Sequence, residues 1–427
     1  MSFRNLLQQN LFWRGWFYLS LFLLNIVIAR AYGAGISGKL FFTINSLQLI
    51  LLITSFSLQS GILYYSSKEK NHQPFLSILS LAWPFAASLA AMGIIYFFFP
   101  GLSELSTQDL FLQQVFPYVA GTMLVTFFSA LIMSNDDYRS GNLFPALINL
   151  FLILVVPLHG NPLSVSRELY IHLFFYSYLL QGLSLAFFYF IKSNRGPFNW
   201  NSSLMKNVFR YSAIALISNL AYYLLYRVDY FFVEYFCDAK ALGNYIQVSK
   251  FGQLFLMIPS TMAAVILPMV AKGNALYEPL KLMGKALFFL WLIILLVLVI
   301  AGKSIFSFLM GPSFNDMQLP LIYLFPGIYF LSQVTLLSAY FGGKGMLRLP
   351  LMANLIAIVI MVITDLLFIP SMGIKGAAIA CSISYGVNLT ILYYYFYRKT
   401  GIGWMEYFVP SKKDVRAVIP LLNGFKF

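Results

Sequence analysis

The stretch YYLLYRVDYFFVEYF, residues 222–236, is apolar and aromatic enough for a lipid bilayer, yet it contains Arg227, Asp229 and Glu234. A charged side chain within a membrane-spanning helix is costly and usually faces a bundle interior or an aqueous cavity. The stretch therefore predicts a membrane-spanning helix with one functional, water-accessible side.

The composition of the whole chain is typical of a membrane protein. Of its 427 residues, 60% are hydrophobic and 10% are charged, whereas about a quarter are charged in a soluble domain. The net charge of +14 could indicate a nucleic-acid partner, but no Lys/Arg-rich run on a soluble domain offers a binding face, so we expect none. Cys237 and Cys381 form no CxxC pair. A bridge between them stays open, and small core residues are the favoured interpretation.

Apolar runs long enough to cross the membrane as a helix, about 20 residues, occur twelve times along the chain. The first is basic and then apolar like a signal peptide, but its length and the lack of a small-residue cleavage site predict an uncleaved span. Long continuous runs also argue against a β-barrel. We expect an all-α polytopic membrane protein with spans at 12–30, 40–64, 75–99, 112–134, 142–159, 169–191, 208–235, 242–269, 284–302, 318–341, 349–369 and 376–397.

The distribution of Lys and Arg predicts the orientation, because cytoplasmic segments carry an excess of both. Placing both termini inside leaves six of the 28 in outer segments, two within spans and the remaining 20 inside. We therefore expect a multi-pass protein of the cytoplasmic membrane with both termini in the cytoplasm. The outer residues are Arg30, Lys39, Arg167, Lys240, Lys303 and Lys375.

The longest inner linker, SNRGPFNWNSSLMK at 193–206, divides the spans into two groups of six. Setting Gly38 on Gly243 also sets Gln48-Leu49 on Gln253-Leu254, which indicates a repeat. Two halves of the same topology imply a parallel repeat about an axis along the membrane normal, as in some transporters. We expect two six-helix bundles around a central cavity, at 1–192 and 207–399, followed by a basic cytoplasmic tail at 400–427.

Helical periodicity sorts the charges of the seventh and eighth spans. At 100° per residue, Asn219, Arg227 and Glu234 share one stripe, while Asp229 points to another side and cannot simply neutralise Arg227. In the eighth span, Gln247, Lys250 and Gln253 recur every three residues, and the second span has Asn45 and Gln48 on its matching side.

From these patterns we expect Arg227 and Lys250 to place charge in a substrate path, with a structural interhelix pair as the alternative. The expected polar lining is Asn45, Gln48, Asn219, Gln247 and Gln253. Asp229, Glu234 and Asp365 are expected to serve as structural or coupling charges.

Motifs for catalysis, metals or cofactors are weak. GAGISG at 33–38 matches a dinucleotide-binding pattern, but a membrane helix precedes it and no acidic residue follows about 20 residues later, so we interpret it as a turn. The three histidines are scattered without ligand spacing. We therefore predict a protein that is not an enzyme, with no catalytic residues, metal site or cofactor.

Two stretches carry a family resemblance. Residues 226–268 contain Arg227, Asp229, Ala-Leu-Gly-Asn-Tyr at 241–245, Lys250 and Leu-Pro at 267–268. Residues 366–385, LLFIPSMGIKGAAIACSISY, form the second match. Both resemble the bacterial Wzx-like polysaccharide-unit flippases of the multidrug/oligosaccharidyl-lipid/polysaccharide exporter superfamily.

The resemblance implies an alternating-access flippase for an undecaprenyl-pyrophosphate-linked oligosaccharide, used for O-antigen, capsule or exopolysaccharide assembly. Its implied partners are this lipid-linked oligosaccharide, membrane lipids, a coupling ion (H⁺ or Na⁺) and other glycan-assembly proteins.

Two other functions stay open. An organic-cation or multidrug exporter of the same superfamily would need acidic groups deep in the first half, whereas the first six predicted spans contain no Asp or Glu. A membrane-embedded polysaccharide polymerase or ligase would need a large charged outer loop. The longest outer loop, around 100–111, has only Glu104 and Asp109.

Overall fold

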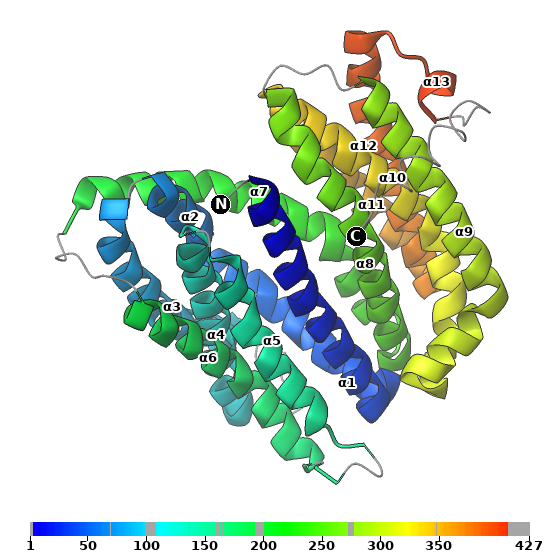
Figure 1. The fold of residues 1–427 in the computed structure, drawn as a ribbon. Helices are drawn as coiled ribbons and strands as arrows, with labels where there is room; N and C mark the ends of the chain where they lie inside the picture. Colours follow the sequence, from blue (N-terminus) through cyan, green and yellow to red (C-terminus); the bar gives the residue numbers. More distant parts are fainter. Residues whose placement is uncertain are drawn as a thin grey trace. The chain divides into compact units, whose positions relative to one another are not determined.

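The computed structural model describes residues 3–68, 70–98, 108–135, 137–158, 162–163, 165–192, 200–271, 277–346 and 348–408. Throughout these ranges the regular secondary structure is helical (Figure 1). The expected all-α class is confirmed, and its physical basis is general: in lipid, each backbone N–H and C=O must be bonded within the protein, which a helix achieves by itself.

The helices of the first part of the chain follow the predicted spans closely. A 3₁₀ turn, η1, at Lys70–His72 leads into the third helix. The helices are α1 (Phe3–Thr54), α2 (Leu58–Lys68), α3 (Gln73–Phe98), α4 (Gln108–Met133), α5 (Tyr138–Leu154), α6 (Arg167–Lys192) and α7 (Ser202–Phe236).

The second part continues in the same manner, with a 3₁₀ segment, η3, at Pro312–Met317. Its helices are α8 (Ala239–Ala271), α9 (Tyr277–Met310), α10 (Gln318–Gly343), α11 (Arg348–Met372), α12 (Ile374–Thr400) and α13 (Trp404–Phe408). Within the described residues, nine helices are long and apolar enough to cross a membrane. The twelve predicted spans exceed this number because α1 contains the first and most of the second, and because α5 has only 17 residues. The side chains of part of α8 lie outside the described residues, so α8 is not counted.

The first two predicted spans meet within α1, and the second is interrupted before it ends. Hydrophobic periodicity shows neither feature. Gly33 adopts a non-helical conformation, with φ 70° and ψ 174°, so α1 consists of two helices joined at GAGISG, where the turn between helices was expected. The second span breaks after Thr54, where Phe56 and Ser57 adopt φ values of 52° and 50°. Such left-handed conformations are uncommon for residues other than glycine. The helix resumes at Leu58 as α2.

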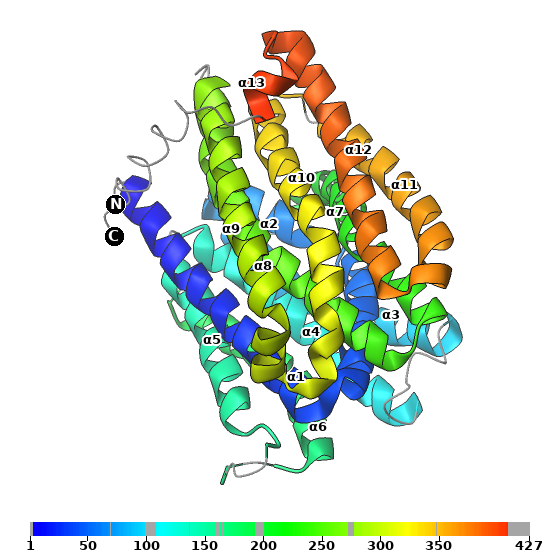
Figure 2. The same ribbon diagram turned by 90° about the vertical axis from the view of Figure 1, so that its right-hand side faces the viewer.

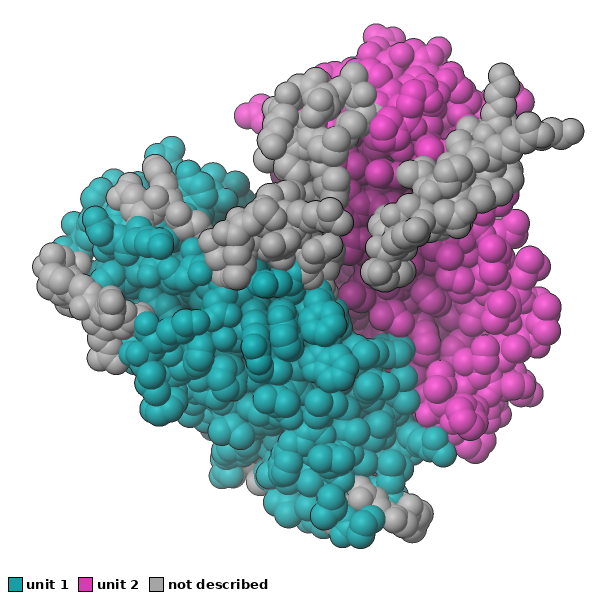
Figure 3. Space-filling view, viewed as in Figure 1, with its two compact units in different colours: residues 1–33, 39–220 teal, residues 34–38, 221–427 magenta. Residues whose placement is uncertain are grey.

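The chain forms two compact units, coloured separately in Figure 3. The first comprises residues 1–33 and 39–220, and the second comprises residues 34–38 and 221–427. The boundary thus falls within α7, and the expected domain limits at 192 and 207 stay a prediction. The expected tail begins with α13, which Glu406 links to Lys281 of α9 by an ion pair; residues 409–427 lie outside the described part.

Each unit packs its helices in a corresponding order. In the first, α4 packs against α2, α3, α5 and α6; in the second, α10 packs against α8, α9, α11 and α12 (Figure 2). Glycine allows the closest crossings: a Cβ on Gly121 would lie 2.2 Å from the backbone of α6, and one on Gly327 would lie 2.8 Å from the Ser382 hydroxyl of α12. Small residues let membrane helices approach in this way.

A reciprocal contact within the second unit involves the two glycines that the repeat pairs. A Cβ on Gly38 would lie 2.6 Å from the Ala239 carbonyl oxygen, and a Cβ on Gly243 would lie 1.9 Å from the Ala34 carbonyl oxygen. The offset that sets Gly38 on Gly243 also sets Ala34 on Ala239, so each contact is the counterpart of the other. Both positions require glycine, because a Cβ at either would overlap the facing backbone.

Candidate substrate-path site

The guanidinium of Arg227 is held by two neighbours in the second unit. It donates to the side-chain oxygen of Gln253 on α8 at 3.0 Å and to the hydroxyl of Tyr230, one turn further along α7. It also lies over the Tyr230 ring, 5.0 Å from the centroid. The Arg227 side chain is half-buried. Among the described residues, this cation between two membrane helices is hydrogen-bonded by neutral groups and not by a carboxylate.

Lys250 lies on α8, one turn before Gln253, and is half-buried. It lies within electrostatic reach of Arg227, where two positive charges would repel each other. In a medium of low dielectric constant such repulsion is much stronger than in water. The structure therefore brings together three residues predicted for the substrate path, namely Arg227, Lys250 and Gln253, in an arrangement that an anion between them would relieve.

Asp229 has a different set of partners from Arg227, as the stripe analysis anticipated. Its carboxylate accepts from the Tyr245 hydroxyl of α8 and from the Cys381 thiol of α12, the latter at 3.3 Å. It also accepts from the Tyr230 backbone N–H at 3.0 Å. The side chain is buried. Asp229 thus joins three helices through neutral donors.

Asp365 on α11 is fully buried, and neither of its carboxylate oxygens has a hydrogen-bond partner among the described residues. It interacts electrostatically with Asp229. An ionised carboxylate in such surroundings is very costly unless it is paired, so Asp365 must either hold a proton or interact with a bound cation. Two acidic groups of the second unit therefore offer a place for a positive ligand, within electrostatic reach of Arg227.

The predicted polar residues of the first unit carry no charge and are dispersed. Asn219 on α7 donates to the Ser57 hydroxyl at 3.2 Å, at the break between α1 and α2. Asn45 is buried, whereas Gln48 is exposed. Of the remaining predicted residues, Gln247 is buried and Glu234 is half-buried.

Four residues of these networks were not predicted from the sequence: Ser57, Tyr230, Tyr245 and Cys381. Tyr230 had a signal, because it shares a helical stripe with Arg227, and Tyr245 belongs to the quoted Ala-Leu-Gly-Asn-Tyr motif. Ser57 and Cys381 had no such signal in the sequence, because each forms its hydrogen bond with a residue on a helix that is distant in the sequence. Both cysteines are free thiols, which answers the open question of a bridge.

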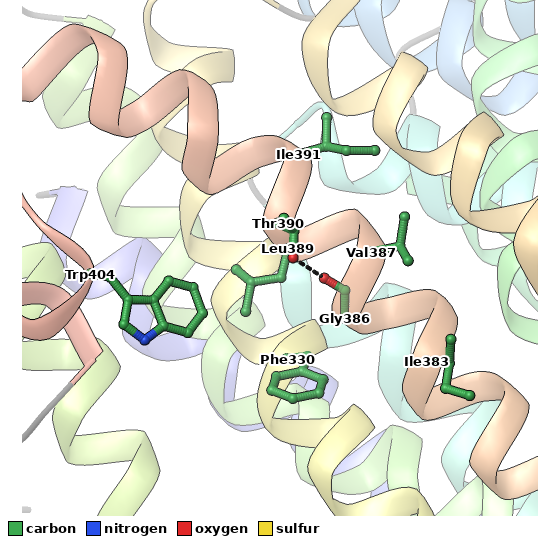
Figure 4. A pocket seen from close by; sticks show the side chains of 8 residues that line it. All are labelled: Phe330, Ile383, Gly386, Val387, Leu389, Thr390, Ile391 and Trp404. Carbon is green, nitrogen blue, oxygen red and sulfur yellow. Dashed lines mark hydrogen bonds between the residues drawn. The ribbon is translucent and has the colours of Figure 1, made fainter.

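One pocket of the second unit has a volume of about 420 Å³ and lies between α10, α12 and the start of α13. Figure 4 shows Trp404 at one side of it and Ile383 and Val387 at the other. The Thr390 hydroxyl is bonded to the Gly386 carbonyl at 2.8 Å within its own helix. Because the lining is apolar and carries no charged group, this pocket is unsuited to a phosphate.

Comparison with known proteins agrees with this architecture. A sequence model of the family described as lipid II flippase MurJ matches residues 71–422. No curated protein sequence matches the chain.

Solved structures of two transporter groups share the fold. A structure titled as the lipid II flippase MurJ in an inward closed conformation has a TM-score of 0.71 at 15% identity, with 98% of this chain and 93% of that chain covered. An inward-facing multidrug resistance MATE transporter of the MOP superfamily has a TM-score of 0.69 at 14% identity, covering 100% and 97%. A MATE transporter from Vibrio cholerae has a TM-score of 0.65 at 12% identity, covering 94% and 99%. These groups are transporters, not enzymes, and the expected superfamily is confirmed.

Proposed function

We propose that this chain, which belongs to the lipid II flippase MurJ family, moves a lipid-linked glycan across the membrane by alternating access. The observation that carries the proposal is the cationic cluster of Arg227 and Lys250, with Gln253 between α7 and α8. Two cations that repel each other within membrane helices are suited to a ligand with two adjacent negative charges. The pyrophosphate of an isoprenoid-linked glycan is such a group.

The hydrogen-bonding geometry supports a phosphate ligand over a simple counter-ion. Gln253 accepts from Arg227 through its oxygen, and its amide nitrogen is buried without a partner among the described residues. An amide N–H and two cations are all donors, and charge-assisted donors to phosphate form the stronger class of hydrogen bonds. An organic cation would meet repulsion in the same place, which disfavours drug export through this cluster.

Two substrates share this chemistry. The family match favours lipid II, while the motifs at 226–268 and 366–385 favour an undecaprenyl-pyrophosphate-linked unit for a surface polysaccharide. Expression in two bacterial strains separates them, one lacking its lipid II flippase and one lacking its polysaccharide-unit flippase. Growth of the first supports lipid II, restored surface glycan in the second supports the polysaccharide unit, and rescue of neither by an abundant membrane protein would refute both.

Lys250 gives the sharpest test of the cluster in whichever strain is rescued. A hydrogen bond to a charged group contributes about 1.5–3 kcal/mol, so Lys250→Ala should reduce flipping roughly 10- to 100-fold. Lys250→Arg should lose much less, because the charge is retained. Flipping and membrane abundance are measured together, and full flipping by Lys250→Ala at normal abundance would show that the lysine is a structural interhelix group.

Coupling to an ion is assigned to the second unit as well. The buried pair of Asp229 and Asp365 contains acidic groups without a cationic hydrogen-bond partner among the described residues. We propose that this pair takes up H⁺ or Na⁺ in step with the transport cycle. Glu234 stays a predicted structural or coupling charge.

The orientation with both termini in the cytoplasm follows from the Lys and Arg distribution and is proposed on that basis. In a cysteine-free background, a cysteine at Lys303 should react with an impermeant maleimide added to intact cells. A cysteine at Ser202 should react only after the cells are opened. The opposite pattern would reverse the topology.

A further inference from the structure

The first unit contains a second pocket, far from the membrane charges in sequence and different from them in chemistry. It has a volume of about 270 Å³ and lies where the connection between α2 and α3 meets the start of α7. Asn71, His72, Phe75, Trp200 and Asn201 contribute to its lining. None of the residues that line it is acidic, lysine or arginine.

Local structure places these side chains firmly. Asn71 and His72 belong to the 3₁₀ turn at Lys70–His72, which leads directly into α3. Asn201 precedes α7, and its side-chain oxygen accepts from the Leu204 backbone N–H at 2.8 Å. This is the capping interaction that asparagine favours at a helix start. The pocket is therefore bordered by residues at or directly before the beginnings of α3 and α7.

Trp200 gives the pocket an open aromatic wall. Its ring meets the ring of Phe75 edge-on, with centroids 5.7 Å apart and an interplanar angle of 81°. Phe75 is buried, whereas 67% of Trp200 is exposed. Edge-to-face packing is a preferred aromatic geometry, and it holds the indole in a defined orientation while its surface stays accessible.

The combination of an exposed indole with neutral amides and an imidazole matches a sugar ring. A pyranose has an apolar face of C–H groups that packs on an aromatic ring, and its rim of hydroxyls both donates and accepts hydrogen bonds. Asn71 and His72 provide groups of both kinds. The volume lies below the range of about 300–1,000 Å³ usual for drug-sized ligands, so it suits a single sugar ring.

We propose that this pocket is a sugar-binding subsite that recognises one ring of the glycan carried by the lipid-linked substrate. The inference rests on the proposed flippase function. It adds a site that would select which glycan the protein transports. The phosphate cluster is common to any pyrophosphate-linked lipid and cannot distinguish glycans. By the Lys and Arg distribution the pocket faces the cytoplasm, where the glycan is taken up.

An exposed tryptophan also serves as an anchor at the membrane interface, and the experiment separates the two roles. Full-length protein in detergent is titrated with N-acetylglucosamine, N-acetylgalactosamine, glucose, galactose, mannose and rhamnose while tryptophan fluorescence is recorded. Inorganic phosphate and vesicles of phosphatidylglycerol are titrated in parallel. Trp200→Phe tests the indole, and Trp16→Phe, which removes another exposed tryptophan, is the matched control.

We expect at least one sugar to change the fluorescence of the wild-type protein and of Trp16→Phe. We expect Trp200→Phe to lose that change and Asn71→Ala to weaken binding of the same sugar at least severalfold. A sugar response that persists without Trp200, no response to any of the six sugars, or a response to phosphate or vesicles alone would overturn the subsite.

The outcome is distinguishable from failure of the proposed function. Sugar binding that depends on Trp200, together with full flipping by Lys250→Ala, would support the sugar-binding subsite and refute phosphate binding by the cationic cluster. Loss of flipping in Lys250→Ala without any sugar response would support phosphate binding by the cationic cluster and refute the sugar-binding subsite.

Discussion

The two units pack their helices in corresponding ways but differ in where they place charged residues. In both, one central helix, α4 or α10, packs against four others of its unit. The second unit places Arg227, Asp229, Lys250 and Asp365 inside its helices, while the predicted spans of the first contain no Asp or Glu. Because the first unit has corresponding helix packing without Asp or Glu in its predicted spans, this packing does not require the acidic residues of the second unit, and their presence there points to function.

The difference also appears in how polar groups are satisfied. In the first unit, Asn219 bonds to Ser57, and Gln181 donates to Asn149, a buried neutral pair at 3.2 Å. In the second, Arg227 and Asp229 are held by neutral partners but not by each other. Neutral hydrogen bonds contribute to helix association at modest cost, whereas charges held apart within the membrane store electrostatic energy that a substrate or ion can relieve.

The largest expected effect compares one residue from each unit. Arg227→Ala removes a charge-assisted contact worth about 1.5–3 kcal/mol and should lower flipping roughly 10- to 100-fold. Asn219→Ala removes a neutral hydrogen bond worth about 0.5–1.5 kcal/mol and should lower it no more than about tenfold. Flipping is normalised to membrane abundance. Equal losses in both variants would contradict the assignment of the charged role to the second unit.

A smaller effect is expected from the acidic pair. Asp365→Asn keeps the shape of the side chain and removes its ability to ionise, so insertion should be normal. Flipping should fall at least about fivefold, the low end of allosteric coupling energies, and should no longer respond to ionophores that collapse ion gradients. Asp229→Asn is the control. Asp229 accepts several hydrogen bonds, so this substitution should also lower the abundance of the protein in the membrane. An Asp365→Asn protein with wild-type flipping and ionophore sensitivity would exclude a coupling role.

The smallest effect concerns a charge outside the spans of the first unit. Burial alone would raise the pKa of Asp137, but hydrogen bonds from Lys192, at 2.7 Å, and from Ser140 outweigh it and hold the pKa below its ordinary value. A lowered folded-state pKa adds stability above the unfolded-state pKa, and this is lost as the pH falls through the folded-state pKa.

Asp137→Asn keeps an N-cap residue at the start of α5 but removes the ion pair, which at the surface contributes about 0.2–1 kcal/mol. Thermal unfolding in detergent should therefore show a small loss of stability at neutral pH that vanishes in acid. A loss of the same size at both pH values would show that only the cap or packing had changed.

The candidate site was predictable in part. Arg227, Lys250 and Gln253 stand out because charged and amide side chains recur at helical spacing in apolar stretches, and the structure brings these three together. The break at Phe56 and Ser57 was not predictable, because its residues are ordinary in a membrane helix and only their φ values are unusual. The exposure of Gln48 beside the buried Asn45 also depends on the neighbouring helices.

The sequence alone determined that the chain crosses a membrane as helices, because lipid leaves a long apolar run no other way to bond its backbone. It also determined that Arg227 and Asp229 point to different sides of one helix, because 100° per residue sets their directions. Only the tertiary structure decided what those directions meet: Gln253, 26 residues from Arg227, and Cys381, 152 residues from Asp229. Periodicity places a side chain around its own helix, but the rotation and approach of the next helix are set by packing between residues far apart in the chain.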